Sequence, residues 1–308
     1  MTMNFSILGS LVPIFVVILA GFLLRKFRFP GDAFWPFAER ITYFVLFPAL
    51  LLQKTASATL DIHTLGPMVV ALLATVLIMA SLLFLIRRWL PIGASSFTSF
   101  FQGGIRINTY IGLSAAFALF GDTGITLAAV AIGVMIPLIN VLCVAILVGF
   151  SDSKSKNWSS LISGIIQNPL IIACAAGITI NITGVNLHSS VSETLLIFGR
   201  ASLPLGLMAL GAALDITAAR NLGKLIILNC GIKLLAMPLC MWTAARILEL
   251  DPMASAIAVL FAALPGSPNA YILARQLGGD SLLMANIVTV QVITSMITLP
   301  VIVALITF

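Results

Sequence analysis

QGGIRINTYI at residues 102–111 and PGSPNAYI at residues 265–272 are two short stretches with a common Asn-x-Tyr-Ile core. Each brings glycine, proline or polar residues into the middle of a long apolar segment. Their asparagines, Asn108 and Asn269, are 161 positions apart (269 − 108), about half of the 308 residues. Paired interruptions in corresponding segments of two halves indicate the substrate site of a secondary transporter.

The composition is that of a membrane protein with several spans. Hydrophobic residues make up 60% of the chain and charged residues 8%, values that a domain with a mostly polar surface hardly reaches. The first apolar run lacks a basic segment before it, so we expect a retained helix and not a cleaved signal peptide. A transmembrane helix needs about 20 mostly apolar residues, and the sequence contains ten such spans, at about 6–24, 37–54, 64–86, 95–120, 124–149, 160–182, 191–214, 224–246, 253–276 and 281–306.

The basic residues indicate the orientation of these spans. The formal net charge is +6, yet the positive charges gather at the connections between spans and form no patch for nucleic acid. The even-numbered connections hold only Lys54 and Arg246. By the positive-inside rule, the odd-numbered connections are cytoplasmic and both termini lie outside. The odd-numbered connections and their flanks hold eleven basic residues: Arg25, Lys26, Arg28, Arg40, Arg87, Arg88, Lys154, Lys156, Arg220, Lys224 and Arg275.

The spans fall into two halves of opposite orientation. Residues 151–158 are polar, follow span five, and are expected to form a cytoplasmic hinge between residues 1–150 and 159–308. Because each half has five spans, the second half enters the membrane in the opposite direction. A proline followed eight positions later by a glycine recurs in spans one and six, from Pro13 and Pro169, which supports a duplication.

Arg106 and Lys233 place positive charge deep inside apolar spans. A helix that starts near Ser95 rises about 1.5 Å per residue, which brings Arg106 close to the bilayer centre, where an unpaired arginine costs about 2.5–3.5 kcal/mol. Arg106 either binds an anion or ties broken backbone carbonyls together. Lys233 either attracts an anion or exchanges a proton, or it neutralises a helix C-terminus at the break.

Asn108 and Asn269 stand at the interruptions, where unwound backbone groups need partners because lipid offers none. Their amides can serve those groups or a ligand equally well. The helix segments that restart after the two interruptions would direct the positive ends of their dipoles into one cavity. With Arg106 and Lys233, this makes the membrane midplane electropositive, so a small organic anion is the expected occupant.

No Asp or Glu lies deep within a span, so a carboxylate proton relay is not expected. The two histidines lie in outer connections and the four cysteines are scattered singly, so we expect no metal, no cofactor and no enzyme activity. Neutral groups can still hold sodium, although such residues more often bond between helices. The candidates for cation coupling are Asn140, Thr289, Gln291 and Thr294, with Thr109 and Ser114.

These stretches also carry a resemblance to a known family. NTYIGL at residues 108–113, continuing to Phe120-Gly121-Asp122, resembles the fourth-helix signature of the auxin efflux carrier family, which includes plant PIN-type carriers and bacterial malonate-type permeases. ALP at residues 263–265 with PNA at residues 268–270 resembles its ninth-helix counterpart. KLL at residues 233–235 and SLPLGL at residues 202–207 fit as well. The short central loop is closer to the bacterial members, so we expect a bacterial inner-membrane protein.

The resemblance implies an all-α membrane fold of ten transmembrane helices, built as two inverted five-helix repeats with broken, crossing helices four and nine. Helices 1, 2, 6 and 7 would form a scaffold that dimerises. Helices 3–5 and 8–10 would form a mobile transport domain that moves as an elevator. The substrate candidates by position are Asn108, Thr109 and Asn269.

One departure from the family pattern concerns the break in helix four. Where many members have proline, this chain has Ser114. The first break is therefore expected to rest on Gly103, Gly104 and Gly112, and the second on Pro265 and Pro268.

We therefore predict a homodimeric secondary transporter that moves a small organic anion, auxin-like or malonate-like, across the membrane by alternating access. The substrate residues would be Arg106, Asn108, Thr109, Asn269 and Lys233. The first alternative is a sodium-coupled carrier of the bile-acid type, which sodium-dependent uptake would reveal. The second is an anion channel, which single-channel currents far above carrier turnover would reveal. The substrate, the direction and the coupling ion stay open.

Overall fold

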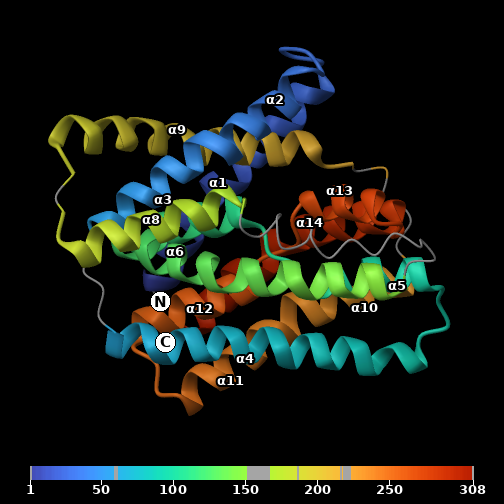
Figure 1. The fold of residues 1–308 in the computed structure, drawn as a ribbon. Helices are drawn as coiled ribbons and strands as arrows, with labels where there is room; N and C mark the ends of the chain where they lie inside the picture. The colour runs from blue at the N-terminus through green and yellow to red at the C-terminus, as the bar shows by residue number, and fades with distance from the viewer. Residues whose placement is uncertain are drawn as a thin grey trace. The chain divides into compact units, whose positions relative to one another are not determined.

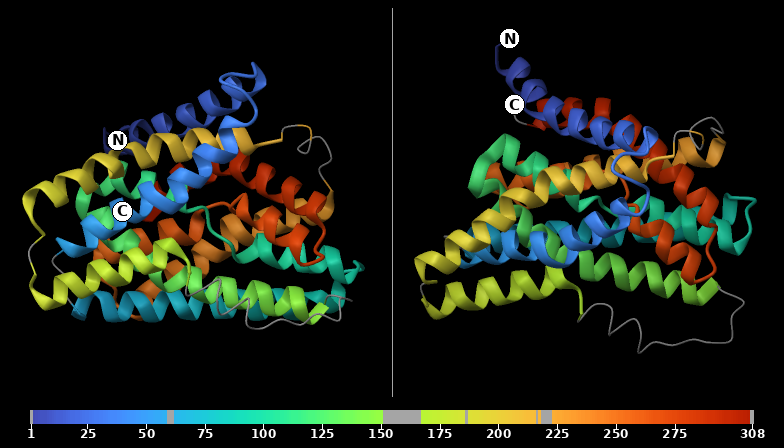
Figure 2. Two further views of the ribbon diagram at one scale, coloured as in Figure 1. Left: turned by 45° about the horizontal axis from the view of Figure 1, so that its top comes forward. Right: turned by 90° about the horizontal axis from the view of Figure 1, so that it is seen from above.

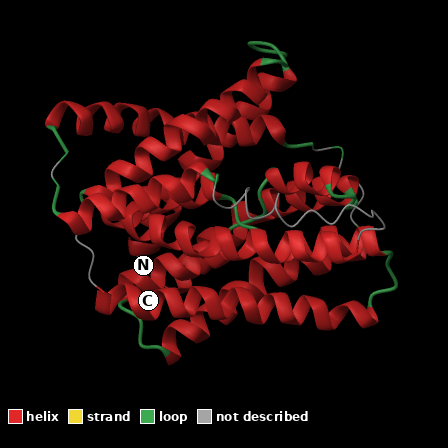
Figure 3. Cartoon of the chain, in the orientation of Figure 1, coloured by secondary structure: helices red, strands yellow, loops and turns green. Residues whose placement is uncertain are grey.

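The computed structural model describes residues 2–58, 62–150, 167–185, 187–215, 217 and 223–306. The expected hinge at residues 151–158 lies outside the described residues. Throughout the described part, the secondary structure is helical and no strand occurs (Figure 3). The expected all-α class is thereby confirmed for the described residues.

The chain order of the elements follows the apolar segments of the sequence (Figure 1). The π-helical turns η1 and η4 each directly precede an X-Pro pair, because a proline cannot donate the backbone hydrogen bond that would close a regular turn. The elements are α1 (Thr2–Lys26), α2 (Phe34–Ile41), η1 (Thr42–Leu46), α3 (Phe47–Ala56), α4 (Ile62–Ile86), the 3-10 turn η2 (Arg87–Trp89), α5 (Ala94–Ile105), α6 (Thr109–Phe150), α8 (Pro169–Thr183), α9 (Ser189–Ala213), α10 (Lys224–Gly231), η4 (Ile232–Ala236), α11 (Met237–Ile247), α12 (Pro252–Ala263), α13 (Asn269–Gln276) and α14 (Ser281–Ile306).

Seven helical segments among the described residues are long and apolar enough to cross a membrane. Helix α14, for example, has 26 residues, and a rise of about 1.5 Å per residue gives it roughly the length needed to cross a hydrocarbon core of about 30 Å. Expected spans four and five fall within the apolar segment Ala94–Phe150, which comprises α5 and α6, and expected spans six and nine overlap the shorter helices Pro169–Thr183 and Pro252–Ala263. The structure therefore supports an integral membrane protein.

Helix starts carry the capping residues that a helix needs. Asp251 accepts hydrogen bonds from the amides of Met253 (2.9 Å) and Ala254 (3.2 Å) at the start of α12, and Pro252 takes the first helical position. Asn168 does the same for α8, and Asp280 Oδ1 accepts from Leu283 N (2.9 Å) at the start of α14. These side chains satisfy amides that have no partner within the helix.

The chain divides into two compact units. Unit 1 comprises Met1–Leu65, Thr109–Gly133 and Gly164–Leu214, and unit 2 comprises Gly66–Asn108, Val134–Ser163 and Asp215–Phe308.

In unit 1, α1 packs against α9, and α3 packs against both α8 and α9 (Figure 1). The ammonium of Lys54 forms an ion pair of 2.7 Å with Asp122, whose side chain is mostly exposed. Asp122 follows Gly121, where α6 has φ 59° and ψ −144°, a backbone conformation open almost only to glycine. This kink lies between expected spans four and five.

In unit 2, α14 packs against α5, α10, α12 and α13, and α11 packs against α12 (Figure 2). Every residue of α5 from Phe97 to Ile105 is buried, including the polar ones. In unit 2, α14 therefore packs against both α5 and α12, the helices that end at the two sequence interruptions.

Candidate functional site

The first interruption separates α5 from α6. Helix α5 ends at Ile105, Arg106 is extended (φ −66°, ψ 148°), and helix resumes only at Thr109. The amide of Arg106 still bonds to the carbonyl of Gln102 at 2.9 Å. Gly103 and Gly104 lie inside α5, and Gly112 lies inside α6. The non-helical residues are therefore Arg106–Asn108, and not the glycines to which the sequence assigned the break.

The second interruption separates α12 from α13. Helix α12 ends at Ala263, Leu264 is extended (φ −64°, ψ 142°), and α13 begins at Asn269. Leu264 precedes Pro265, and a residue before proline is driven out of the helical region. Pro265 and Pro268 also have no amide hydrogen to continue a helix. Here the expected prolines do lie where the helix stops.

Two side chains replace the backbone hydrogen bond that ends α12. In a continuing helix, the amide of Gly266 would donate to the carbonyl of Ala262. Instead, Gly266 N donates to Gln291 Oε1 at 2.7 Å, and Ala262 O accepts from Lys233 Nζ at 3.2 Å. Both halves of the missing bond are thus satisfied inside the protein, as a lipid surrounding requires.

Gln291 on α14 also reaches the first interruption. Its Nε2 donates to the carbonyl of Gly103 at 2.9 Å and to Asn229 Oδ1 at 2.8 Å. The carbonyl of Gly103 would otherwise bond to Ile107 N, which is no longer helical. Asn229 on α10 donates in turn to Phe100 O at 2.6 Å. Gln291 and Asn229 are both fully buried.

Asn108 joins the two interruptions directly. Its Nδ2 lies 3.4 Å from the carbonyl of Gly266, and the asparagine is 1% exposed. This distance is at the long end for a hydrogen bond. The amide of Asn108 therefore serves the backbone of the second interruption, which is one of the two roles that the sequence left open.

Arg106 places a positive charge at the first interruption. Its Nη2 donates to Asn140 Oδ1 at 3.2 Å on α6, and its side chain is partly exposed. Within the described ranges, the ion pair between Lys54 and Asp122 is the only one found, so Arg106 contacts no carboxylate there. A guanidinium with an amide neighbour and no counter-charge is suited to binding an anion.

Lys233 has a different environment. It lies in η4, is 0% exposed, and donates to Met237 Sδ at 3.0 Å as well as to Ala262 O. Ala262 is in the last turn of α12, where a helix carries its partial negative charge. The geometry favours the structural role of Lys233, that of neutralising the helix C-terminus at the break.

The remaining predicted residues are distributed over several elements. Asn269 is the first residue of α13 and half-buried, and Thr109 is the first residue of α6 and buried. Thr289 and Thr294 lie on α14 and contribute no interaction to the contacts around Gln291 described above. Ser114 is buried inside α6, in unit 1, and its hydroxyl has no hydrogen-bond partner among the described residues.

Sequence reasoning missed Asn229 and did not assign a role to Gln102. Asn229 lies one helical turn before Lys233, so a polar pair on one face of an apolar span was the available signal. Gln102 is fully buried on α5, and neither amide atom has a partner within the described chain. It lies four positions before Arg106, whose amide donates to the Gln102 carbonyl at 2.9 Å.

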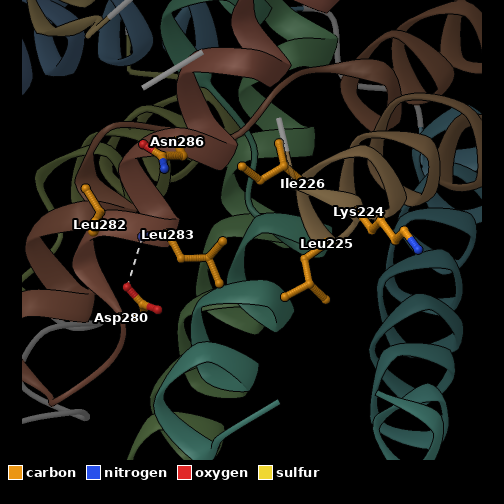
Figure 4. A pocket seen from close by; sticks show the side chains of 8 residues that line it. Lys224, Leu225, Ile226, Asp280, Leu282, Leu283 and Asn286 are labelled. Carbon is orange, nitrogen blue, oxygen red and sulfur yellow. Dashed lines mark hydrogen bonds between the residues drawn. The ribbon is translucent and has the colours of Figure 1, made fainter. Parts of the chain in front are cut away.

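A cavity of about 330 Å3 lies elsewhere in unit 2, between the starts of α10 and α14 (Figure 4). In Figure 4, Leu225, Ile226 and Leu283 surround it and the Asp280 carboxylate is bonded to the backbone of Leu283. None of the residues predicted from the sequence as site residues lines this cavity. The predicted site is thus defined by the interruptions and not by this cavity.

Comparisons with known proteins agree with a transport role. A family model described as membrane transport protein matches residues 154–303. The match includes the second interruption together with Lys233 and Gln291, whereas the first interruption precedes it. A search of curated proteins gave no match.

Proposed function

We propose that the chain, of which residues 154–303 match the membrane transport protein family that includes the auxin efflux carriers, is a secondary transporter of a small organic anion. The observation that carries this proposal is the environment of Arg106. Its guanidinium lies at a non-helical segment, contacts an amide, and forms no ion pair with a described carboxylate. A carboxylate substrate would supply the missing charge.

In the proposed site, Arg106 binds the carboxylate and the neighbouring polar residues orient it. Asn108, Thr109 and Asn269 are the further substrate residues proposed here, as the family resemblance implies. Lys233 is assigned a supporting role, because its ammonium already donates to Ala262 O and Met237 Sδ and is fully buried. The site would therefore offer one cation to the substrate, and not two.

The proposed architecture has ten transmembrane helices in two inverted five-helix repeats, with helices four and nine broken and crossing. The short helices α5, α12 and α13, which end or begin at the interruptions, support this assignment. Unit 2 contains most of the proposed transport domain, and unit 1 contains the proposed scaffold helices. The segment Thr109–Gly133 differs, since it falls in unit 1.

We further propose elevator-type alternating access by a homodimer that associates through the scaffold helices, in a bacterial inner membrane. At an inside-negative membrane potential, the export of one negative charge is favoured by about 2.3 kcal/mol for each 100 mV. Export can therefore proceed without a coupling ion. Import of the same anion would need a co-transported cation. Sodium coupling is the alternative, and the thermal-shift screen described next distinguishes it.

A thermal-shift screen of the purified chain tests this proposal. Mono- and dicarboxylates, including malonate and indole-3-acetate, are added with and without sodium and across pH, since a ligand that binds the native state raises its apparent stability. We expect at least one carboxylate to stabilise the wild-type protein and not the Arg106→Gln variant. Stabilisation that requires sodium would favour the sodium-coupled alternative. Equal shifts in both proteins, or no shift with any anion, would contradict the proposed site.

A further inference from the structure

Gln291 links both interruptions to one helix. Its side chain holds Gly266 N in the second interruption at 2.7 Å and Gly103 O at the end of α5 at 2.9 Å. Its third bond, of 2.8 Å, goes to Asn229 Oδ1 on α10. We name Gln291 and Asn229, with the backbone groups of Phe100, Gly103 and Gly266 that they bind, the interruption brace.

The brace satisfies backbone groups that have lost their helical partners. A buried amide or carbonyl without a partner costs the full desolvation of that group, and lipid supplies no water to replace the bond. One amide side chain can both donate and accept, so a single glutamine serves an orphan carbonyl at one interruption and an orphan amide at the other. An aliphatic residue at this position would leave both without partners.

The same contacts argue against Gln291 as a ligand for sodium or substrate. Its Oε1 accepts from Gly266 N, both acceptors of Nε2 are protein groups, and the side chain is 0% exposed. The sequence raised Gln291 as a candidate for cation coupling. Its neighbours instead make it part of the support for the site.

We propose that Gln291 is a positioning residue: through the interruption brace it fixes the two interruptions to each other, so that Asn108 and Arg106 keep the geometry that binds the anion. This inference deepens the proposed function and rests on it. The link runs from Gln291 to Gly266 N, and from Gly266 O to Asn108 Nδ2 at 3.4 Å. Arg106 follows Gly103 by three residues on the same segment.

Hydrogen exchange of the full chain in nanodiscs tests the brace without any substrate. Pro265 and Pro268 carry no amide hydrogen, so a peptide covering residues 265–268 reports only Gly266 and Ser267. In Gln291→Leu we expect these amide hydrogens to exchange about tenfold faster than in wild type. This is the factor that corresponds to the loss of one ordinary buried hydrogen bond. Gln291→Glu keeps an acceptor for Gly266 N but loses the two bonds that Nε2 donates, so residues 266 and 267 should exchange more slowly in it than in Gln291→Leu.

Ser295→Ala is the matched control. Ser295 is a buried polar residue on the same helix, and its hydroxyl donates only to Val292 O at 2.7 Å, within α14. This variant should leave exchange at residues 265–268 unchanged. Equal exchange in Gln291→Leu and Ser295→Ala would overturn the brace.

Uptake into proteoliposomes tests the positioning role, with radiolabelled malonate and indole-3-acetate as probes. For Gln291→Leu we expect the half-saturation concentration of a transported probe to rise roughly tenfold, because a tenfold loss of affinity corresponds to the free energy of about one hydrogen bond. The maximal rate should change less. A lower maximal rate at an unchanged half-saturation concentration would make Gln291 merely structural and overturn this role. If wild type takes up neither probe, the proposed function fails, while the exchange experiment still decides the brace.

Discussion

Arg106 and Lys233 show how two cations with similar sequence settings differ in their surroundings. Arg106 contacts the amide of Asn140 and is partly exposed, whereas the Lys233 ammonium is enclosed by Ala262 O and Met237 Sδ. A charge already bonded to a helix C-terminus has little left to offer a ligand. The distinction leads to opposite expectations for the two substitutions.

Replacement of Arg106 by glutamine should weaken carboxylate binding while the protein stays folded. Glutamine can still bond to Asn140, but it removes the charge, and hydrogen bonds to charged groups contribute about 1.5–3 kcal/mol, or roughly ten- to a hundredfold in affinity. Titration calorimetry with the best carboxylate from the screen measures the change. Arg246→Gln, at an exposed position of unit 2, is the control and should bind like wild type.

Replacement of Lys233 by methionine should mainly reduce stability. The carbonyl of Ala262 would lose its described side-chain donor in a buried site, at a cost of about 1–3 kcal/mol. Lys233→Gln retains an N–H donor and should lose less. Thermal unfolding in detergent measures the stability of both variants. A strong loss of carboxylate affinity in a stable Lys233→Gln protein would contradict the structural role and indicate that Lys233 binds the substrate.

At the scale of single elements, glycine in α5 permits close packing and does not break the helix. A Cβ added at Gly103 would lie 2.7 Å from Asn229 Oδ1 and 2.7 Å from Ile287 Cγ2. Real side chains do not approach so closely, and both neighbours belong to helices packed on α5. The helix therefore runs through Gly103 and stops only at Arg106.

Gly103→Ala should destabilise the protein by about 1–3 kcal/mol, as overpacking of a core does. It should also disturb the bond between Gln291 and Asn229. Gly133→Ala on α6 is the matched control, because no atom lies within 4 Å of its added Cβ, and alanine is favoured over glycine inside a helix. Thermal unfolding that ranks the two variants in the reverse order would refute this packing argument.

The sequence predicted the location of both interruptions, because proline and polar residues inside apolar spans have few structural explanations. Pro265 and Pro268, to which it assigned the second break, lie between the end of α12 at Ala263 and the start of α13 at Asn269, and their missing amide hydrogens act locally. It assigned the first break to Gly103, Gly104 and Gly112, which lie inside α5 and α6, because packing by Asn229 and Ile287 from distant segments is not visible in the local sequence. Asn229 escaped notice for the same reason: its partners are 62 and 129 residues away.

At the scale of the whole molecule, the basic residues predict that both termini lie outside the cytoplasm. An even number of spans puts the termini on one side, and the excess of Lys and Arg in odd-numbered connections puts that side outside. Fusion of alkaline phosphatase to the C-terminus should give an active enzyme, and fusion of a fluorescent protein that matures only in the cytoplasm should stay dark. The reverse result would invert the predicted topology.

The division into two units bears on the proposed elevator motion. Unit 2 brings together both interruptions, Arg106, Lys233 and Gln291 in one compact body, with internal hydrogen bonds from Asn108 to Gly266 and from Gln291 to Gly103. A site whose backbone is bonded within one body can move without losing its geometry. The α3 and α6 segments of unit 1 are joined separately, by Lys54 and Asp122.

The central claim is that Arg106, which forms no ion pair with a described carboxylate, binds the small organic anion that the protein moves across the membrane. Uptake of a panel of radiolabelled mono- and dicarboxylates into proteoliposomes under an inside-positive potential measures this directly, with wild type and Arg106→Gln reconstituted in equal amounts. We expect at least one carboxylate to accumulate with wild type and not with Arg106→Gln. Accumulation of none of them, or equal accumulation with both proteins, would contradict the claim.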